Sequence, residues 1–242
     1  MYRDDPAAVA GEYFRAGPQY KPAIPGPRQD RLALWGTGAS PAGLDHAAEI
    51  LDVYLSFLAQ TESLKRTFDA ARAAAAARGR RLPCGVLGSL IVRDTDDEAW
   101  EHFAWQLAQT DPAETARLAD RNLRSFGFPG LAEISSDDPQ VQARIEALRA
   151  GRLPSRTELE YAPGMAAGLT TWTSGEPPFD IAGKGSGNYF VGSPQTVADN
   201  IRRLSEECGV DHWILSGWPL AREARRFAEQ VIPLLARELV HG

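Results

Sequence analysis

The chain has 242 residues and a formal net charge of −6, from 26 Lys and Arg against 32 Asp and Glu. This length suffices for a sizeable core, in one large or two small domains. The acidic balance argues against a broad nucleic-acid-binding face, because such faces need clustered cations. Apolar stretches stop well short of the roughly 18 residues that a membrane span needs, and no apolar run follows a basic start as in a cleaved secretion signal.

From residue 32 onward, the chain repeats one pattern: a short apolar strand, a polar or Gly-rich turn, and a helix. The expected strands are 32–35, 52–57, 84–92 and 213–216, and the first of them is expected to be buried. The expected helices begin at residue 41, cover 61–77, 99–109 and 194–208, and close with 222 to about 240. Such alternation predicts parallel βαβ units. Residues 1–31 are rich in Pro and turn residues, with one strand expected at 11–14.

Two helix starts carry local signals. Ser40 before Pro41 is a good N-cap followed by a good first helical residue. Asp94, Asp96 and Asp97 resemble a cluster of catalytic carboxylates. They stand, however, where acidic residues favour a helix start, and we interpret them as capping residues.

Residues 111–189 do not follow the alternation of short strands and helices. Weak helical stretches at 112–126 and 139–150 precede a loop rich in Gly, Pro and Thr at 163–188. An irregular stretch this long is typically a lid, a binding loop or disorder. We therefore predict that 111–189 is an insertion or lid region, and that 163–188 is the most mobile internal segment because it offers few apolar contacts.

The cysteines and histidines exclude several kinds of site. Cys84 and Cys208 do not make a disulfide framework and fit a reducing interior, so a cytoplasmic location is expected. Cys84 begins an apolar strand, where a buried, inert thiol is the default. The four histidines are scattered without ligand spacing, so no metal site is expected.

Three ordered groups of segments carry a family resemblance. They are WGTGAS (35–40) with AAE (47–49) and DVYL (52–55); RAAAAARGR (72–80) with the strand 85–92 and RDTDDEAW (93–100); and VGSPQTVA (191–198) with GVD (209–211) and LSGWP (215–219). Together, from about residue 11 to the C-terminus, they resemble the bacterial luciferase-like, flavin-dependent monooxygenases. The likeness is greatest to the alkanesulfonate monooxygenase branch.

The resemblance implies an α/β fold, the (β/α)8 TIM barrel with a long insertion before its last strand. It covers only the C-terminal part of the family, so one domain over 1–242 would hold a partial barrel of four βα units, with strands at about 32–36, 52–57, 84–92 and 212–216. Half a barrel leaves two open strand edges and an uncovered core. We therefore expect a homo-oligomer, a separately encoded N-terminal half, or a smaller rearranged barrel. The alternative explanation for the missing half is a wrongly assigned start codon.

The turn from residue 36 to residue 40 is the best cofactor candidate. A Gly-rich turn that enters a helix offers backbone N–H groups and a positive dipole end, which suit a phosphate. The resemblance implies that this turn lies at the flavin phosphate and that Ser40 matches a family hydroxyl there. The predicted FMN-binding residues are Gly36, Thr37, Gly38, Ala39, Ser40 and Trp218. The alternative is a tight turn whose Ser40 only caps the helix.

The predicted substrate pocket consists of Phe57, Leu87, Ser89 and Lys184. In the sulfonate branch an arginine and a histidine occupy the inward positions of Leu87 and Ser89, so their absence argues against sulfonate chemistry. Lys184 lies in a Gly-rich loop at 183–188, followed by a strand, and would approach the phosphate or substrate. A solvated lysine in a flexible linker is the alternative, and the spacing excludes a nucleotide-binding P-loop.

The resemblance implies a component of a two-component monooxygenase that acts on a small organic substrate. A separate flavin reductase would supply reduced FMN (FMNH2), and O2 would be the co-substrate. The alternative is a non-catalytic paralogue or subunit that serves as a binding or structural partner. Leu87, Ser89 and the absent half-barrel favour this alternative.

Overall fold

The computed structural model describes residues 9–13, 15–16, 29, 31–38, 40–109, 111–125, 127–168 and 188–236. The chain forms two compact units, residues 1–34 and 35–242. In the first, β1 (Val9–Ala10) and β2 (Arg15–Ala16) pair as an antiparallel hairpin. The strand expected at 11–14 is wrong, because the described residues 11–13 form the bend of this hairpin. Gly11, a preferred turn residue, opens that bend.

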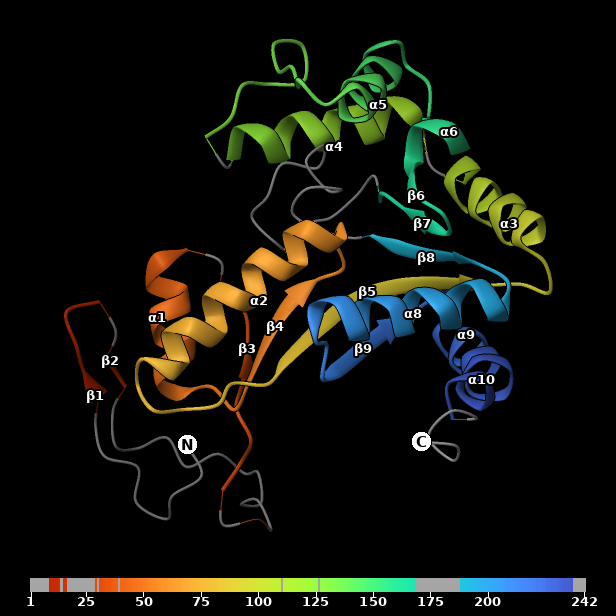
Figure 1. Cartoon of the computed structure of the whole chain (residues 1–242). Helices are drawn as coiled ribbons and strands as arrows, with labels where there is room; N and C mark the ends of the chain where they lie inside the picture. Colours follow the sequence, from red (N-terminus) through yellow and green to blue (C-terminus); the bar gives the residue numbers. More distant parts are fainter. Residues whose placement is uncertain are drawn as a thin grey trace. The chain divides into compact units, whose positions relative to one another are not determined.

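The second unit is built on a curled parallel sheet (Figure 1). Its strands are β3 (Trp35–Gly36), β4 (Val53–Phe57), β5 (Cys84–Val92) and β9 (His212–Ser216). β3 pairs with β4, β4 with β5, and β5 with β9, all in parallel. This order is that of four consecutive barrel strands, which confirms the predicted partial barrel.

The first predicted strand is shorter and more exposed than expected. Only Trp35 and Gly36 are extended partners of β4, and Leu34 and Trp35 are 46% and 44% exposed. The prediction of a buried strand at 32–35 is therefore wrong. The apolar residues of 32–35 predict a strand that is buried on both faces. A parallel strand is buried only when it has a neighbouring strand on each side and cover on both faces. Among the described strands, β3 has only β4 beside it.

A second group of strands extends the sheet beyond the end of β4. β8 (Tyr189–Gly192) pairs in parallel with residues 89–92 of β5, whereas β4 pairs with residues 84–87. β7 (Met165–Ala166) lies antiparallel to β8 and forms a hairpin with β6 (Glu160–Ala162). The sequence indicates a strand near residue 189 but not the strands with which it pairs. The loop expected at 163–188 is thus wrong at its start, because Met165 and Ala166 are already β7.

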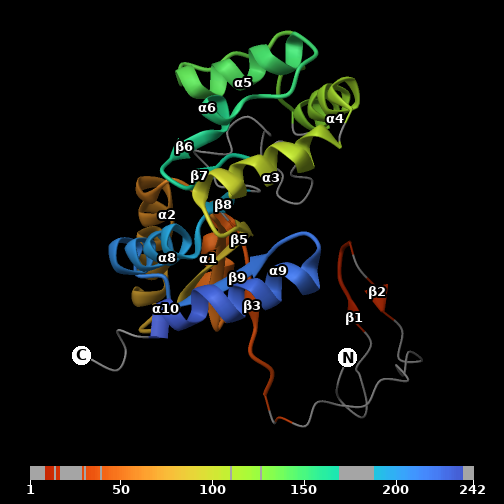
Figure 2. The same cartoon turned by 90° about the vertical axis from the view of Figure 1, so that its right-hand side faces the viewer.

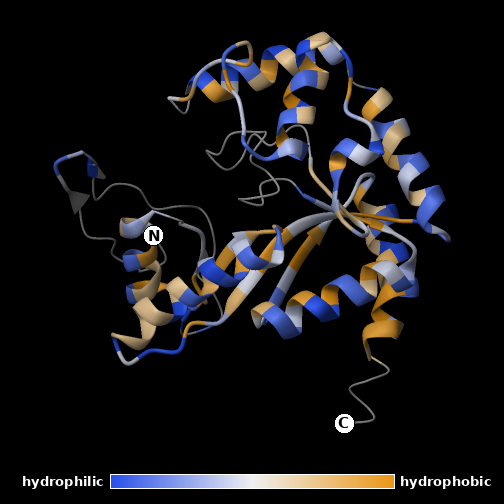
Figure 3. Cartoon of the chain, turned by 45° about the horizontal axis from the view of Figure 1, so that its top comes forward, coloured by the Kyte–Doolittle hydropathy of each residue, from blue (hydrophilic) through white to orange (hydrophobic). Residues whose placement is uncertain are grey.

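Helices cover the outer face of the sheet (Figure 1). They are α1 (Pro41–Ile50), α2 (Thr61–Ala76), α8 (Pro194–Cys208) and a continuous segment of α9 (Leu220–Arg226), η1 (Phe227–Val231) and α10 (Ile232–Ala236). Pro233 explains the wider π-turns of η1, because it lacks an N–H and its ring clashes with the carbonyl four residues earlier. The main core lies between sheet and helices, where Tyr54, Val86 and Phe68 are fully buried. Figure 3 shows the mainly hydrophobic strands between amphipathic helices.

The expected helical stretches of residues 111–150 are present. α3 (Asp96–Ala108) lies beside β8 (Figure 2). Trp100 and Phe103 of this helix share a buried cluster with Val191 of β8. α4 (Pro112–Ser125) and α5 (Pro139–Arg149) share a small core of their own that includes Leu123 and Ile145. Whether 111–189 acts as a lid stays a prediction. The proposed mobility falls mainly on 169–187, outside the described residues.

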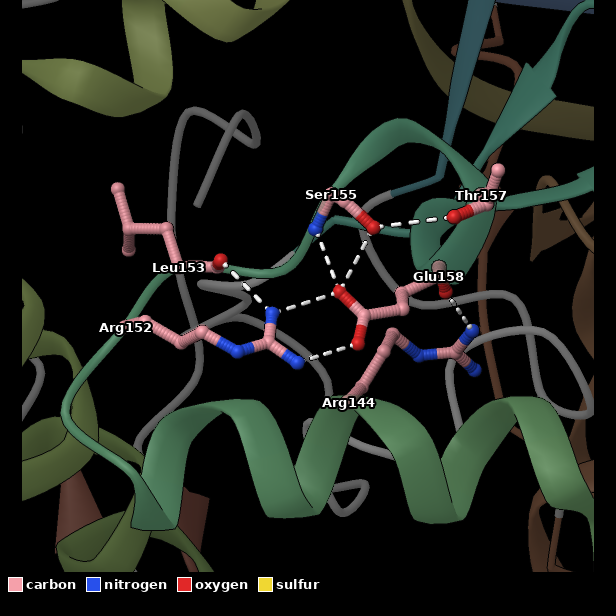
Figure 4. A network of polar contacts seen from close by, with 6 residues as sticks. All are labelled: Arg144, Arg152, Leu153, Ser155, Thr157 and Glu158. Atoms are coloured by element: carbon pink, nitrogen blue, oxygen red, sulfur yellow. Dashed lines mark hydrogen bonds and ion pairs between the residues drawn. The ribbon is translucent and has the colours of Figure 1, made fainter.

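A polar network fixes the turn from α5 into α6 (Arg156–Leu159) (Figure 4). Both carboxylate oxygens of Glu158 accept from the Arg152 guanidinium, at 2.8 and 2.6 Å, and one accepts from the Ser155 N–H at 2.7 Å. The hydrogen bonds from Arg152 lower the pKa of Glu158 to about 2. The buried Arg144 donates to the Glu158 carbonyl at 2.8 Å, so this network holds β6 in place after α6.

Two kinds of feature are absent from the described part of the chain. None of its helices combines the length and the apolar composition that crossing a membrane requires. No group of three or more His, Cys, Asp and Glu in it is arranged to hold a metal ion.

Candidate functional site

The inner, concave face of the sheet carries the candidate site. Because the side chains of paired residues in parallel strands point to the same face, the residues of this face can be read from the register. They are Trp35, Val53, Leu55, Phe57, Gly85, Leu87, Ser89, His212, Ile214 and Ser216. The alternate residues, such as Tyr54 and Val86, lie beneath the outer helices.

The sheet curls strongly enough for its edge strands to touch. The rings of Trp35 on β3 and His212 on β9 are 4.8 Å apart, although β4 and β5 lie between these strands. Gly85 gives the room for this contact. A Cβ there would lie 2.8 Å from Leu55 Cδ2 and 3.1 Å from His212 Cβ. The curvature is therefore that of a barrel segment, not of an open sheet.

Toward the C-terminal strand ends, an apolar layer gives way to hydroxyl groups. Phe57, Leu87 and Ile214 are register neighbours, and Ser89 is paired with both Ser216 and Tyr189. The structure therefore brings together three of the four predicted pocket residues. Lys184, the fourth, lies outside the described residues.

Tyr189 is a site residue that sequence reasoning missed. Burial raises the pKa of its phenol, against a hydrogen bond from the Ser89 side chain that lowers it. Its ring packs on Phe103, with centroids 5.0 Å apart. The strand signal after the Gly-rich loop was visible, but the pairing of this strand with Ser89 was not.

The turn after β3 is held by contacts with the first turn of α1 and with β4. Ser40 Oγ accepts from the Gly43 N–H at 3.1 Å, and Pro41 follows as the first helical residue, as predicted. The Tyr54 hydroxyl donates to the Gly38 carbonyl at 3.1 Å. A Cβ on Gly43 would lie 2.9 Å from Gly38 Cα, so the close approach of turn and helix requires glycine.

This turn can accept a phosphate, but mainly through side chains. Pro41 has no N–H and the Gly43 N–H is already bound to Ser40, which reduces the backbone donors at the helix start. A serine hydroxyl keeps its own proton to donate while its oxygen accepts. Thr37 and Ser40 are exposed, and the dipole of the ten-residue α1 favours an anion here. Ala39 lies outside the described residues.

Trp218 lies apart from this turn in the sheet order. It follows β9, whereas the turn follows β3, and β4 and β5 separate these strands. Trp218 is 69% exposed, and its carbonyl accepts from Gln106 Nε2 at 3.0 Å. Gln106 also contacts His102, at 3.2 Å, and burial together with the charge of Arg93 lowers the pKa of that histidine. Trp218 is therefore tied to α3 in this structure.

Comparison with known proteins decides the family. The sequence profile of luciferase-like monooxygenases matches residues 1–212. The chain belongs to this family. The alkanesulfonate branch within it is not shown.

Solved structures support the fold. The riboflavin lyase RcaE, crystallised with modified FMN and riboflavin, has a TM-score of 0.63 and 21% identity over 96% of this chain and 48% of its own. DmoA from Hyphomicrobium sulfonivorans has a TM-score of 0.62 and 20% identity over 95% and 46%. A coenzyme F420-dependent tetrahydromethanopterin reductase from Methanopyrus kandleri has a TM-score of 0.55 and 17% identity over 94% and 57%. This luciferase-like chain thus spans about half the length of these relatives.

Proposed function

We propose that this luciferase-like chain is a component of a reduced-flavin-dependent, two-component monooxygenase that acts on a small organic substrate. The observation that carries the proposal is the exposed Ser40 hydroxyl at the start of α1, at the C-terminal end of a barrel strand, in a chain of this family. The C-terminal strand ends are where barrels of this kind place their active sites. A flavin reductase would supply FMNH2, and O2 would be the co-substrate.

In this proposal the turn binds the phosphate end of FMN. The Ser40 hydroxyl donates to a phosphate oxygen, Thr37 offers a second hydroxyl, and Gly38 lets the backbone approach closely. When bound, reduced flavin supplies the electrons that activate O2. The apolar layer of Phe57, Leu87 and Ile214 would exclude water, and the Ser89 and Tyr189 hydroxyls would orient the reacting end of the substrate. A coenzyme F420-dependent enzyme shares this fold, so the fold alone does not select the cofactor. The choice of FMN is therefore part of the proposal.

Two matched variants of Ser40 test the phosphate contact. Ser40→Asp and Ser40→Asn both keep good helix caps, but only the first puts a carboxylate where the phosphate would lie. We expect Ser40→Asp to weaken FMN binding at least tenfold, and Ser40→Asn to leave it within about threefold, by flavin fluorescence titration. Riboflavin, which has no phosphate, is the control ligand and should respond equally to both. Equal FMN affinities for the two variants would contradict the phosphate site.

A second candidate is a non-catalytic subunit that keeps the fold as a binding or structural partner. The inner face favours it, because its described residues in β3, β4, β5 and β9 include no Asp, Glu, Lys or Arg. Stopped-flow absorbance after mixing the photoreduced FMN complex with O2 separates the two candidates. An oxygenase would change the time course of flavin reoxidation relative to free reduced FMN, and a structural subunit would leave that time course unchanged.

A further inference from the structure

One side-chain amide ties the segment after β9 to α3. Gln106 Nε2 lies 3.0 Å from the Trp218 carbonyl oxygen and 3.2 Å from His102 Nε2. A carbonyl oxygen only accepts, so the nitrogen of the Gln106 amide must face Trp218. This nitrogen can only donate, so His102 Nε2 must be the acceptor of its second hydrogen. The network therefore assigns a neutral His102 that carries its proton on Nδ1.

Protonation of His102 is incompatible with this arrangement. Both ring nitrogens of an imidazolium carry a proton, so its Nε2–H would face the hydrogens of Gln106 Nε2. If the Gln106 amide turned over, its oxygen would accept from His102 but would also face the Trp218 carbonyl, which cannot donate. Neither orientation of the amide satisfies both neighbours. The charged donor makes the stronger hydrogen bond, so the contact with Trp218 is the one that is lost.

The surroundings of His102 favour its neutral form. Burial lowers the pKa of this histidine below its ordinary 6.5, and three positive charges lower it further, against the negative charge of Glu223. The positive charges come from the residue after β5 and from α9: Arg93, Arg222 and Arg226. On its own helix, the ring of His102 stacks on Trp105, with centroids 5.3 Å apart. The imidazole is therefore neutral at pH 7, as the contact with Trp218 requires.

We propose that Gln106 is a positioning residue that holds the Trp218 segment on α3 only while His102 is neutral. The contact is present at neutral pH and is lost as the pH falls and His102 takes up a proton. Trp218 follows β9 at its C-terminal end, where barrels of this kind place their active sites, so its release changes the wall of the candidate site. The effect on FMN binding rests on the proposed function, whereas the contact itself does not.

19F NMR of the full chain labelled with 5-fluorotryptophan tests the contact, from pH 8 to about pH 4.5, across the range in which histidine titrates. The Trp105 and Trp218 resonances are assigned by substitution of each residue with Phe. Because the Trp105 ring stacks on His102, its resonance reports the charge of the imidazole directly. We expect the Trp218 resonance to titrate with the same midpoint. A Trp218 resonance that stays constant through the Trp105 midpoint would overturn the proposal.

Two variants separate the hydrogen-bonded link from the bare charge of His102. Gln106→Leu removes the link and leaves the stacked rings, so Trp105 should still titrate and Trp218 should not. His102→Gln keeps an acceptor for Gln106 without a titrating group, so Trp218 should keep its high-pH resonance throughout. His46→Gln, on an exposed position of α1, is the matched control and should change neither titration. If Trp218 still titrates with Trp105 in a Gln106→Leu variant that is folded by circular dichroism, Gln106 does not position it.

Flavin titration gives a readout that depends on the proposed function. A released Trp218 segment must be ordered again before it contacts the flavin, which costs affinity. Below the Trp105 midpoint, we therefore expect the wild type to bind FMN at least about threefold more weakly than His102→Gln at the same pH. Comparison at one pH cancels the titration of the FMN phosphate itself. Equal affinities together with the expected NMR result would contradict the role of Trp218 in flavin binding, and not the proton-controlled contact.

Discussion

The buried ion pair between α9 and the end of β5 allows a stability prediction. Glu223 is fully buried, and its two carboxylate oxygens lie 3.0 and 3.2 Å from Nη1 of Arg93. The Arg93 side chain is 13% exposed and directly follows β5. Glu223→Ala would leave the buried Arg93 charge without its charged partner, with only the Val92 carbonyl still accepting from it, in the region where α9 covers the sheet.

The magnitude follows from this burial. Removal of one partner of a buried pair costs about 3–5 kcal/mol, because the remaining charge stays desolvated. We therefore expect Glu223→Ala to lower the free energy of unfolding by about 3–5 kcal/mol. Glu223→Gln keeps the shape and one acceptor, and should cost about 1–3 kcal/mol. The double variant Arg93→Met with Glu223→Leu removes both charges and should lie within about 1 kcal/mol of the wild type.

Urea unfolding followed by circular dichroism at neutral pH measures the wild type and each of these variants. The coupling between the two sites is the deviation of the double variant from the sum of Arg93→Met and Glu223→Leu measured singly. A Glu223→Ala cost below about 1 kcal/mol, or a double variant as unstable as the single ones, would refute the reasoning.

Three further predictions rest on local geometry. Glu158→Gln should lower stability by about 1 kcal/mol at pH 7, a small value because Arg152 is half exposed. Since the folded pKa of Glu158 is about 2 against an ordinary 4.5, this difference should hold above pH 5 and shrink as the pH falls toward 2, by urea unfolding at each pH. Gly43→Ala should lower the melting temperature, despite the better helix propensity of alanine, because its Cβ meets Gly38; a rise would show that the turn can move. Burial raises the pKa of the Cys84 thiol to about 11, so at pH 8 a disulfide reagent should modify it only at the rate of unfolding, and rapid labelling would contradict that burial.

Local sequence patterns predict the elements that depend on local chemistry. The strand 84–92 and the helix 194–208 match their predicted bounds. The strand is a run of apolar and small residues, and the helix begins after the Ser193 cap with Pro194 and ends at Gly209. The Ser40 cap behaves as expected. The interpretation of Asp94, Asp96 and Asp97 as capping residues is wrong, because Thr95 is the N-cap of α3 and Asp96 and Asp97 lie in its first turn, where acidic residues favour the helix start. Thr95 and Glu98 form the capping box there, and Asp96 accepts from the Ser193 N–H, which helps to hold its pKa low against the opposite effect of burial.

Features that depend on distant residues could not be predicted in this way. The exposure of Trp35 follows from which strands are neighbours, and no local pattern contains that information. Tyr189 meets Ser89 because β8 continues the sheet where β4 ends, 100 residues along the chain from Ser89. The pairing of Arg93 with Glu223 depends on the packing of α9 over β5. Such contacts come from tertiary structure, which composition and periodicity do not encode.

The affinity ratio of FMN to riboflavin tests the central claim most directly. If the turn from Gly36 to Ser40 holds the flavin phosphate, the wild-type chain should bind FMN about ten to a hundred times more tightly than riboflavin, since charge-assisted hydrogen bonds are worth roughly 1.5–3 kcal/mol. Isothermal titration of both flavins, free of phosphate buffer, gives this ratio. Equal affinities, or no binding of FMN, would contradict the account.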